Sequence, residues 1–209
     1  DNKLLTSALL NLKYPMIKEN DTGSKFLTPL ASFRYSPNKG ANLINQNTLL
    51  EFQNLFELDR INNKTVENGP SMTLGIEYKN QNKFNEEKLN FGLAMNFRRE
   101  KDEDLPISSS LGEKTSDLIG YSGINITDNF SVNYNFLIDK NFSGTNYSLA
   151  SADYSGSKFK TSFKYLEKSK LIGDESYLNN YTQLELNKSN SIAFETDKNL
   201  DKNLTNYYN

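Results

Sequence analysis

The sequence contains no cysteine, no histidine and no tryptophan. Without cysteine and histidine, these residues can form no disulfide, no thiol or Ser-His catalytic centre and few zinc sites. A carboxylate or Ser-Lys mechanism would still be possible, but no convergent pair is visible. We therefore expect neither an enzyme nor a cofactor.

Two further absences concern charge and hydrophobic runs. The formal net charge is −2 and no basic patch stands out, so a nucleic-acid partner is not expected. The mean hydropathy is −0.69, and no apolar run approaches the ~20 residues of a membrane helix. Transmembrane β-barrels stay open as a class, because their strands need be apolar only at alternate positions.

What the sequence does contain is strict alternation, most clearly over residues 88–99 and 130–138. Large apolar residues occupy every second position, and small or polar residues lie between them. A period of two predicts β-strands with two unlike faces. We expect one face to contact lipid: Leu89, Phe91, Leu93, Met95, Phe97, Phe130, Val132, Tyr134, Phe136 and Ile138. We expect the other to face a wet lumen: Asn90, Asn96, Arg98, Ser131, Asn133 and Asn135.

The same pattern predicts about ten strands, at residues 6–17, 25–35, 71–78, 88–99, 116–126, 130–138, 145–154, 159–165, 180–187 and 191–196. Short and long links alternate over the last six of them. Outer-membrane barrels have short periplasmic turns and long outer loops. The pattern favours an all-β fold, an antiparallel transmembrane β-barrel segment within a larger barrel. A soluble meander or stacked β-sheet protein is the alternative.

Several short motifs follow one another along the chain. They are Phe26-Leu27-Thr28-Pro29, Tyr35-Ser36-Pro37, Asn54-Leu55-Phe56 with Asp59-Arg60, Val66-Glu67-Asn68-Gly69, Leu74-Gly75-Ile76-Glu77-Tyr78, and Ser116-Asp117 at a strand start. In order and spacing they resemble the β-barrel region of the LPS-assembly protein family (LptD, also called OstA or organic solvent tolerance protein). The resemblance covers about residues 10–165, and no motif is specific alone.

The sequence departs from the family pattern at two places. Asn62-Asn63-Lys64-Thr65 stands where the family often carries a second Asp-Arg. Pro70-Ser71 replaces the Arg that usually follows the Gly. Cysteines that form disulfides in many members also have no counterpart here.

The resemblance implies a location in the outer membrane of a Gram-negative bacterium and a role in lipopolysaccharide (LPS) transport. The implied partners are LPS, outer-membrane lipids, an LptE-like plug lipoprotein inside the barrel, and a periplasmic LPS bridge protein. The lipid would enter the outer leaflet through an opening between the first and last barrel strands. We expect residues 1–209 to be the middle of the barrel domain, without the jelly-roll domain and the gate strands.

The main candidate site is the loop that carries the family motif: Asn54, Leu55, Phe56, Asp59, Arg60, Val66, Glu67 and Gly69. It could fold into the lumen and pair Asp59 and Arg60 with wall or plug residues. Alternatively, it is a structural loop anchored to a rim by Leu55 and Phe56. Ser116 and Asp117 form a second candidate, at the start of a strand.

Acidic residues suggest two weaker sites. Asp102, Glu103 and Asp104 are hard oxygen ligands that could hold Ca²⁺, but short charge runs are usually solvated, which is the interpretation we favour. Residues 197–208 open like a calcium loop but place Lys202 and Tyr208 where Gly and Glu are required, so we reject that site.

Three functions remain in order of preference. The first is a barrel segment that inserts LPS into the outer leaflet. The second is another outer-membrane barrel, a porin or receptor channel. The third is a soluble or surface β-sheet binding protein, which would need no detergent.

Overall fold

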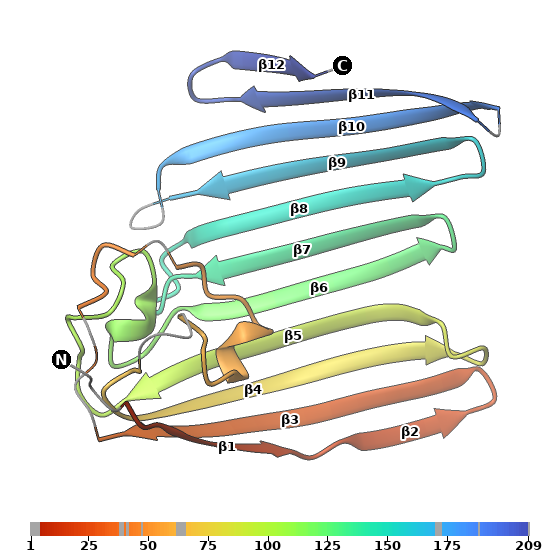
Figure 1. Ribbon diagram of the computed structural model, residues 1–209. Helices are drawn as coiled ribbons and strands as arrows, with labels where there is room; N and C mark the ends of the chain where they lie inside the picture. Colours follow the sequence, from red (N-terminus) through yellow and green to blue (C-terminus); the bar gives the residue numbers. More distant parts are fainter. Residues whose placement is uncertain are drawn as a thin grey trace.

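The computed structural model describes residues 5–37, 40, 42–46, 48–61, 66–169, 173–187 and 189–208. These residues form one antiparallel sheet of 12 strands, in which β1 and β2 both lie along β3 and each strand from β3 to β12 lies beside its neighbour in sequence (Figure 1). The strands are β1 (Ala8–Lys13), β2 (Met16–Asn20), β3 (Gly23–Ser36), β4 (Gly69–Asn82), β5 (Glu87–Arg98), β6 (Leu118–Thr127), β7 (Phe130–Ile138), β8 (Thr145–Ser155), β9 (Phe159–Lys168), β10 (Glu175–Asn187), β11 (Asn190–Asn199) and β12 (Leu204–Tyr208). Two short 3₁₀ turns, η1 (Asn54–Phe56) and η2 (Ser110–Gly112), lie in the links.

The first expected strand is split in two. β1 and β2 both pair with β3, and the break at Tyr14 and Pro15 lies opposite Thr28 and Pro29. The pairing register is the same on both sides of the break, so no residue bulges out. Proline has no N–H to donate, which is why the ladder is interrupted where Pro15 lies opposite Thr28 and Pro29 lies opposite Tyr14.

Other boundaries differ at the ends of strands. β4 and β10 are longer than expected, so residues 79–82 and 175–178 belong to strands rather than links. β12 adds a further strand at the end of the chain. These added residues are mostly polar and carry little alternation, because backbone pairing with a neighbouring strand extends the element there.

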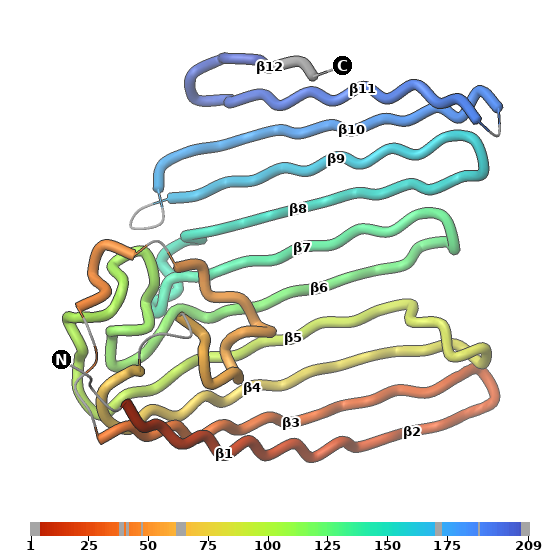
Figure 2. Tube along the Cα trace, in the orientation of Figure 1, coloured from red at the N-terminus to blue at the C-terminus, as the bar shows by residue number. Residues whose placement is uncertain are grey.

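Links of different length gather at opposite ends of the sheet (Figure 2). Residues 21–22, 83–86, 128–129 and 156–158 form short turns at one end. At the other end lie the first long link, residues 37–68, and the second long link, residues 99–117, together with residues 139–144. Within the described residues no pairing joins β1 to β12, so the sheet is open.

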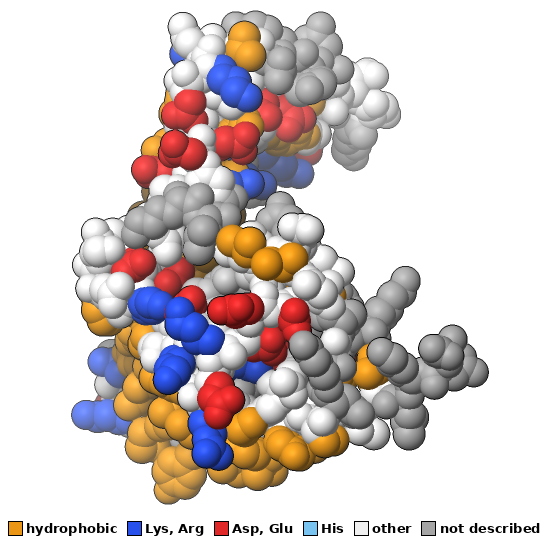
Figure 3. Space-filling view, turned by 90° about the vertical axis from the view of Figure 1, so that its left-hand side faces the viewer, with side chains coloured by type: hydrophobic (Ala, Val, Ile, Leu, Met, Phe, Trp, Pro, Cys, Tyr) orange, Lys and Arg blue, Asp and Glu red, His pale blue; other side chains and the backbone are white. Residues whose placement is uncertain are grey.

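The pairing register separates the side chains of the sheet into two faces. On the uncovered face, Phe33, Met72 and Leu74 are 51%, 41% and 43% exposed. The neighbouring residues Ser32 and Thr73 are buried on the opposite face, beneath the long links. Seen from the loop end, charged side chains gather on the links, and hydrophobic ones cover much of the surface below them (Figure 3). We call the two the uncovered face and the link-covered face.

The apolar core lies between the links and the sheet. Leu43, Leu50, Phe52 and Leu55 of the first link and Leu105 and Leu111 of the second form what we call the link core. Leu55 and Leu111 are both 0% exposed. The sheet beneath the links, which we call the wall, contributes Leu30, Ala94, Ile119, Leu137 and Tyr147. Among the described residues no helix is long and apolar enough to span a membrane.

Candidate functional site

A buried cluster of charged side chains joins the first long link to the sheet. Arg34 of β3, Arg98 of β5 and Arg60 of the link surround the Glu67 carboxylate, and we call this set the arginine–glutamate cluster. Arg60 binds Glu67 through two bonds, Nε–Oε1 at 2.5 Å and Nη2–Oε2 at 2.6 Å. Arg98 Nη1 lies 3.0 Å from Oε2, and Arg34 Nη1 lies 3.5 Å from Oε1.

Arg60 also reaches the sheet itself. Its Nη1 donates to Asn96 Oδ1 at 3.0 Å and to Thr73 Oγ1 at 3.3 Å, and its Nη2 donates to Ser71 Oγ at 3.3 Å. Arg34 and Arg98 donate in turn to the backbone carbonyls of Glu57 and Asn68. The link and three wall strands are therefore held by the same network.

The cluster contains more positive than negative charge at its centre. Burial alone would raise the pKa of Glu67, but Arg60, Arg34 and Arg98 outweigh it and hold that pKa below its ordinary value. Asp102 accepts from Arg98 Nη2 at 3.3 Å and offsets part of the surplus. Within the described residues the buried Nε atoms of Arg34 and Arg98 have no hydrogen-bond partner. Glu67 is thus the anion on which the arrangement depends.

Aromatic side chains of the first link occupy spaces left by two glycines of the wall. A Cβ atom at Gly75 would lie 2.8 Å from Phe56 Cζ, and one at Gly92 would lie 2.9 Å from Phe52. Phe52 packs edge-on against Phe56 and Tyr121, at ring distances of 5.5 and 5.0 Å. A larger residue at Gly75 would push Phe56 of the link away from the sheet, and one at Gly92 would displace Tyr121 of β6, whose Cε1 lies 2.4 Å from the Cβ position, together with Phe52.

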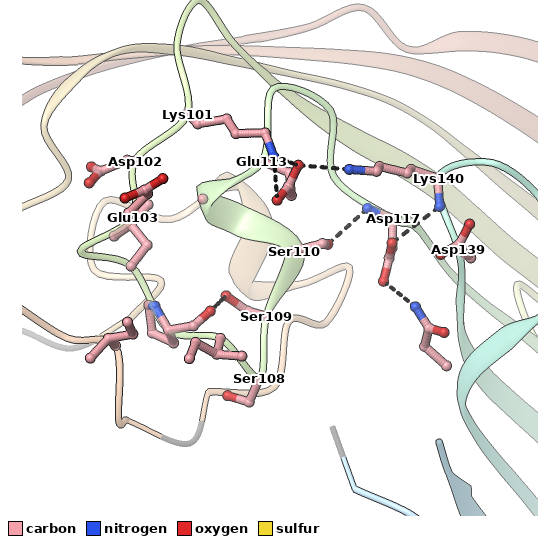
Figure 4. Close-up of a pocket in the computed structure, with 16 residues that line it drawn as sticks. Lys101, Asp102, Glu103, Ser108, Ser109, Ser110, Glu113, Asp117, Asp139 and Lys140 are labelled. Carbon is pink, nitrogen blue, oxygen red and sulfur yellow. Dashed lines mark hydrogen bonds and ion pairs between the residues drawn. The ribbon is translucent and has the colours of Figure 1, made fainter. Parts of the chain in front are cut away.

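Ser116 and Asp117 connect three segments where β6 begins. Ser116 Oγ accepts from Asn96 N at 2.8 Å, and Asp117 Oδ2 accepts from Asn146 Nδ2 at 2.8 Å. Asp117 also accepts from the backbone N–H of Lys140 at 3.2 Å (Figure 4). The pair therefore ties the second long link to β5 and to the β7–β8 link.

A pocket of about 440 Å³ opens beside this pair, among the second long link and residues 139–146 (Figure 4). Lys101 and Lys140 both bind Glu113, with Nζ–Oε2 distances of 2.9 and 2.7 Å. Hydrogen bonds from Lys140 and Lys101 hold the pKa of Glu113 below its ordinary value. Of the expected acidic run, Asp102 is bound to Arg98 and half-buried rather than solvated. In the described part of the chain, no group of three or more acidic side chains is arranged to hold a metal ion.

Comparison with known families decides the identity of this sheet. Residues 2–202 match the family model of LptD, LPS transport system D. The chain belongs to the LptD family. LptD proteins are components of LPS transport in the outer membrane of Gram-negative bacteria; they are β-barrels and not a known enzyme family. A search of curated proteins gives no match to this chain.

In this LptD chain the family-motif residues fall into two groups. Leu55, Phe56, Arg60 and Glu67 lie against the link-covered face, as described above. Asn54 closes the turn η1 by accepting from Glu51 N at 3.0 Å, and Gly69 begins β4 with a φ of +72°, a conformation that suits glycine. Asp59 is exposed, and Val66 is half-buried. The departure at residues 62–65 lies outside the described residues.

The residues expected on opposite faces of β5 and β7 are separated as the alternation predicts. Asn90, Asn96, Arg98, Ser131, Asn133 and Asn135 share the link-covered face of the LptD sheet. Leu89, Phe91, Leu93, Met95, Phe97, Phe130, Val132, Tyr134, Phe136 and Ile138 share the uncovered face. Which face contacts lipid stays a prediction.

Several site residues escaped the sequence analysis, among them Arg34 and Gly92, and Gly75 was quoted there only as part of a motif. Arg34 lies between Phe33 and Tyr35, at a polar position of an alternating strand, which was a usable signal. The glycines also fall on the polar side of the alternation. No pattern in the sequence relates them to Phe52 and Phe56, because that contact depends on the path of the link.

Proposed function

We propose that residues 1–209 are part of a transmembrane β-barrel that inserts LPS into the outer leaflet of the outer membrane. The observation that carries this proposal is the polarity of the sheet. Apolar side chains cover the exposed face, while arginine, asparagine and serine are buried on the other. A soluble sheet protein would bury the apolar face instead, whereas a barrel in lipid has this arrangement.

The two ends of the sheet give the barrel an orientation. The short turns would lie in the periplasm and the long links at the cell surface, as in other outer-membrane barrels. LPS would arrive from a periplasmic bridge protein and leave sideways, between the first and last strands of the complete barrel. These steps follow from the family and rest on no contact described above.

The inner face beyond the links supports a role for a plug lipoprotein of the LptE type. Over β9–β11 the described links leave this face uncovered, and a groove of about 330 Å³ lies there, bordered by Leu149 of β8. Leu149, Leu166 and Tyr177 form its apolar part, with Lys164 and Asp197 beside them. Such a mixed surface suits a protein partner better than a bare water channel.

Depletion of the full-length protein in its own cells tests this function. We expect newly made LPS to stop reaching the cell surface and to accumulate on the periplasmic side, and wild-type protein to restore its export. Two complementing variants form a matched pair: Phe136→Arg adds a charge to the face proposed to contact lipid, and Asn133→Arg adds the same charge to the opposite face. Comparing them distinguishes a loss of lipid contact from a general effect of introducing an arginine. Normal surface LPS during depletion would reject the proposed function.

A further inference from the structure

We propose that the uncovered face of β9–β11 carries a docking site for the lipid anchor of LPS (lipid A), in the outer leaflet around the barrel. The site recognises a phosphorylated headgroup and a β-hydroxylated acyl chain beneath it. The inference rests on the proposed function, because it requires a barrel in lipid with its loop end at the cell surface. It adds a lipid site on the outside of the sheet, separate from the inner face and from the links.

Four polar side chains lie together on the uncovered face of β9–β11, and we call them the threonine–asparagine patch. Asn180 of β10 lies opposite Thr196 of β11, and Thr182 of β10 lies opposite Thr161 of β9. The register from Phe136 of β7 through β8 to β9 places these positions on the uncovered face. In other strands of that face, such as β5 and β7, large apolar residues occupy the equivalent positions.

Hydrogen bonding within the patch leaves room for a ligand. Thr161 Oγ1 and Thr182 Oγ1 lie 2.9 Å apart, and Thr182 Oγ1 donates to Asn180 Oδ1 at 3.3 Å. One bond does not exhaust a carbonyl oxygen, so Asn180 Oδ1 can accept from a second donor, and the Thr196 hydroxyl can both donate and accept. Polar groups that face hydrocarbon are costly, so a lipid that is itself polar at this depth would stabilise them.

The rows of paired residues give the depth of the patch. Tyr165 and Lys198 lie in the next row toward the loop end, and Glu167, which accepts from the Tyr165 hydroxyl at 3.2 Å, lies in the row beyond (Figure 1). In a tilted strand each row lies about 5 Å deeper than the last. Asn180 is therefore about 5 Å and Thr182 about 10 Å below the Lys198 row. Tyrosine and lysine favour the membrane interface, so the patch lies in the upper hydrocarbon of the outer leaflet.

This order of groups fits lipid A better than a phospholipid. Lipid A carries phosphates on its sugars and hydroxyl groups on its acyl chains just beneath them, whereas phospholipid chains have no polar group below their esters. The Lys198 ammonium is placed to pair with a phosphate, and Asn180 and Thr196 are placed to bond the acyl hydroxyl. The row below the patch, which would contact the hydrocarbon of the chain, is apolar: Phe159, Leu184 and Ile192.

Photocrosslinking tests the site in the full-length protein with its bound partners, in phospholipid vesicles that contain lipid A as a minor component. Benzoylphenylalanine replaces Phe163, which lies opposite Asn180. In a reference protein it replaces Phe33 of β3, which lies on the same face and is similarly exposed, at 51% against 50%. We expect the ratio of lipid A adducts to phospholipid adducts, measured by mass spectrometry, to be several-fold higher at position 163. A lipid A analogue without acyl hydroxyls should lose most of this preference.

Variants of the protein labelled at position 163 show which groups matter. Asn180→Leu/Thr196→Val removes the polar groups and nearly keeps side-chain size, so it should lower the preference for hydroxylated lipid A several-fold. Lys198→Gln should lower the adducts of both lipid A forms. The matched control is Ser122→Ala, which removes a hydroxyl from the same face of β6, opposite Tyr134, and should label like the wild type.

Three results would overturn the proposal: equal ratios at positions 163 and 33, a ratio that neither patch variant changes, or a loss in Ser122→Ala as large as in the patch variants. If the double variant does not insert, Lys198→Gln alone decides. The two proposals fail in different ways. A wild-type protein that is released from membranes by urea and shows no gel shift rejects the barrel, and with it the proposed function. A wild-type protein that inserts and exports LPS but gives equal ratios rejects the docking site alone.

Discussion

At the residue scale, Glu67 is the carboxylate that three buried arginine side chains share. Three guanidinium groups depend on its carboxylate, and those of Arg60, Arg34 and Arg98 come from a link and two strands. Removing one partner of a buried ion pair costs far more than the pair contributes, because the remaining charges stay buried.

The variant Glu67→Gln should therefore destabilise the docked link by about 3–5 kcal/mol. Limited proteolysis of the full-length protein in detergent measures this, since an undocked first link becomes a cleavage site. Glu19→Gln, at an exposed position of β2, is the control and should cleave like the wild type. Equal resistance of all three proteins would show that the cluster does not hold the link.

Acid should release the same link without any mutation. Because the pKa of folded Glu67 lies below its ordinary value of 4.5, its contribution to stability is complete above that value. It is lost as the pH falls through the folded-state pKa. The protection of residues 48–61 from hydrogen–deuterium exchange, taken relative to the intrinsic exchange rate at each pH, should fall below pH 4.5 in the wild type and depend less on pH in Glu67→Gln. Identical pH profiles would contradict this prediction.

Arg60 and Glu67 could be selected from the sequence, but their pairing could not. The sequence analysis expected both Asp59 and Arg60 to pair with wall or plug residues, whereas the structure exposes Asp59 and pairs Arg60 with Glu67 as well as with the sheet. Adjacent residues in an extended link point in different directions. The partner of a buried charge is therefore decided by which side chain the link turns toward the wall.

At the element scale, the alternation in β5 and β7 predicts the two faces of the sheet residue by residue. Four of the five large apolar side chains of β5 have an apolar cross-strand partner on β4, such as Phe91 with Tyr78, whose rings stack at 5.2 Å, while Leu89 lies opposite Asn80. The period of two is enough to assign faces when it is strict. It fails at the polar ends of β4 and β10, where backbone pairing alone continues the strand.

A pair of substitutions on β7 tests which face contacts lipid. Phe136→Arg should cost about 2–4 kcal/mol of folding free energy if the residue lies near the bilayer midplane. Asn133→Arg, on the link-covered face, should cost much less because its charge stays in water. Urea unfolding in lipid vesicles compares the two. Equal costs would overturn the face assignment.

At the scale of the whole molecule, the described residues form an open sheet, in which no pairing joins the first strand to the last. The uncovered face exposes large side chains such as Phe33 and Phe163, at 51% and 50%. A surface of this kind predicts lipid or detergent around it.

The full-length protein should thus stay in native membranes during urea extraction and migrate faster on SDS gels before boiling than after. A closed barrel resists the detergent until it is heated, because its strands leave no free edge. Release by urea and a single gel position would support the soluble-sheet alternative. This is the first measurement to make, since the other predictions assume its outcome.

The neighbour-to-neighbour order of the strands also has a kinetic consequence. Each strand pairs with one that is close in sequence, so the wall can assemble by successive local hairpins. Contacts of the links span much longer separations, such as the 60 residues between Thr48 and Ser108. Closing longer loops costs more entropy, so we expect the wall to form first and the links to dock last. The first residues to become protected during refolding would then be those of the strands, and the buried side chains of the links would follow.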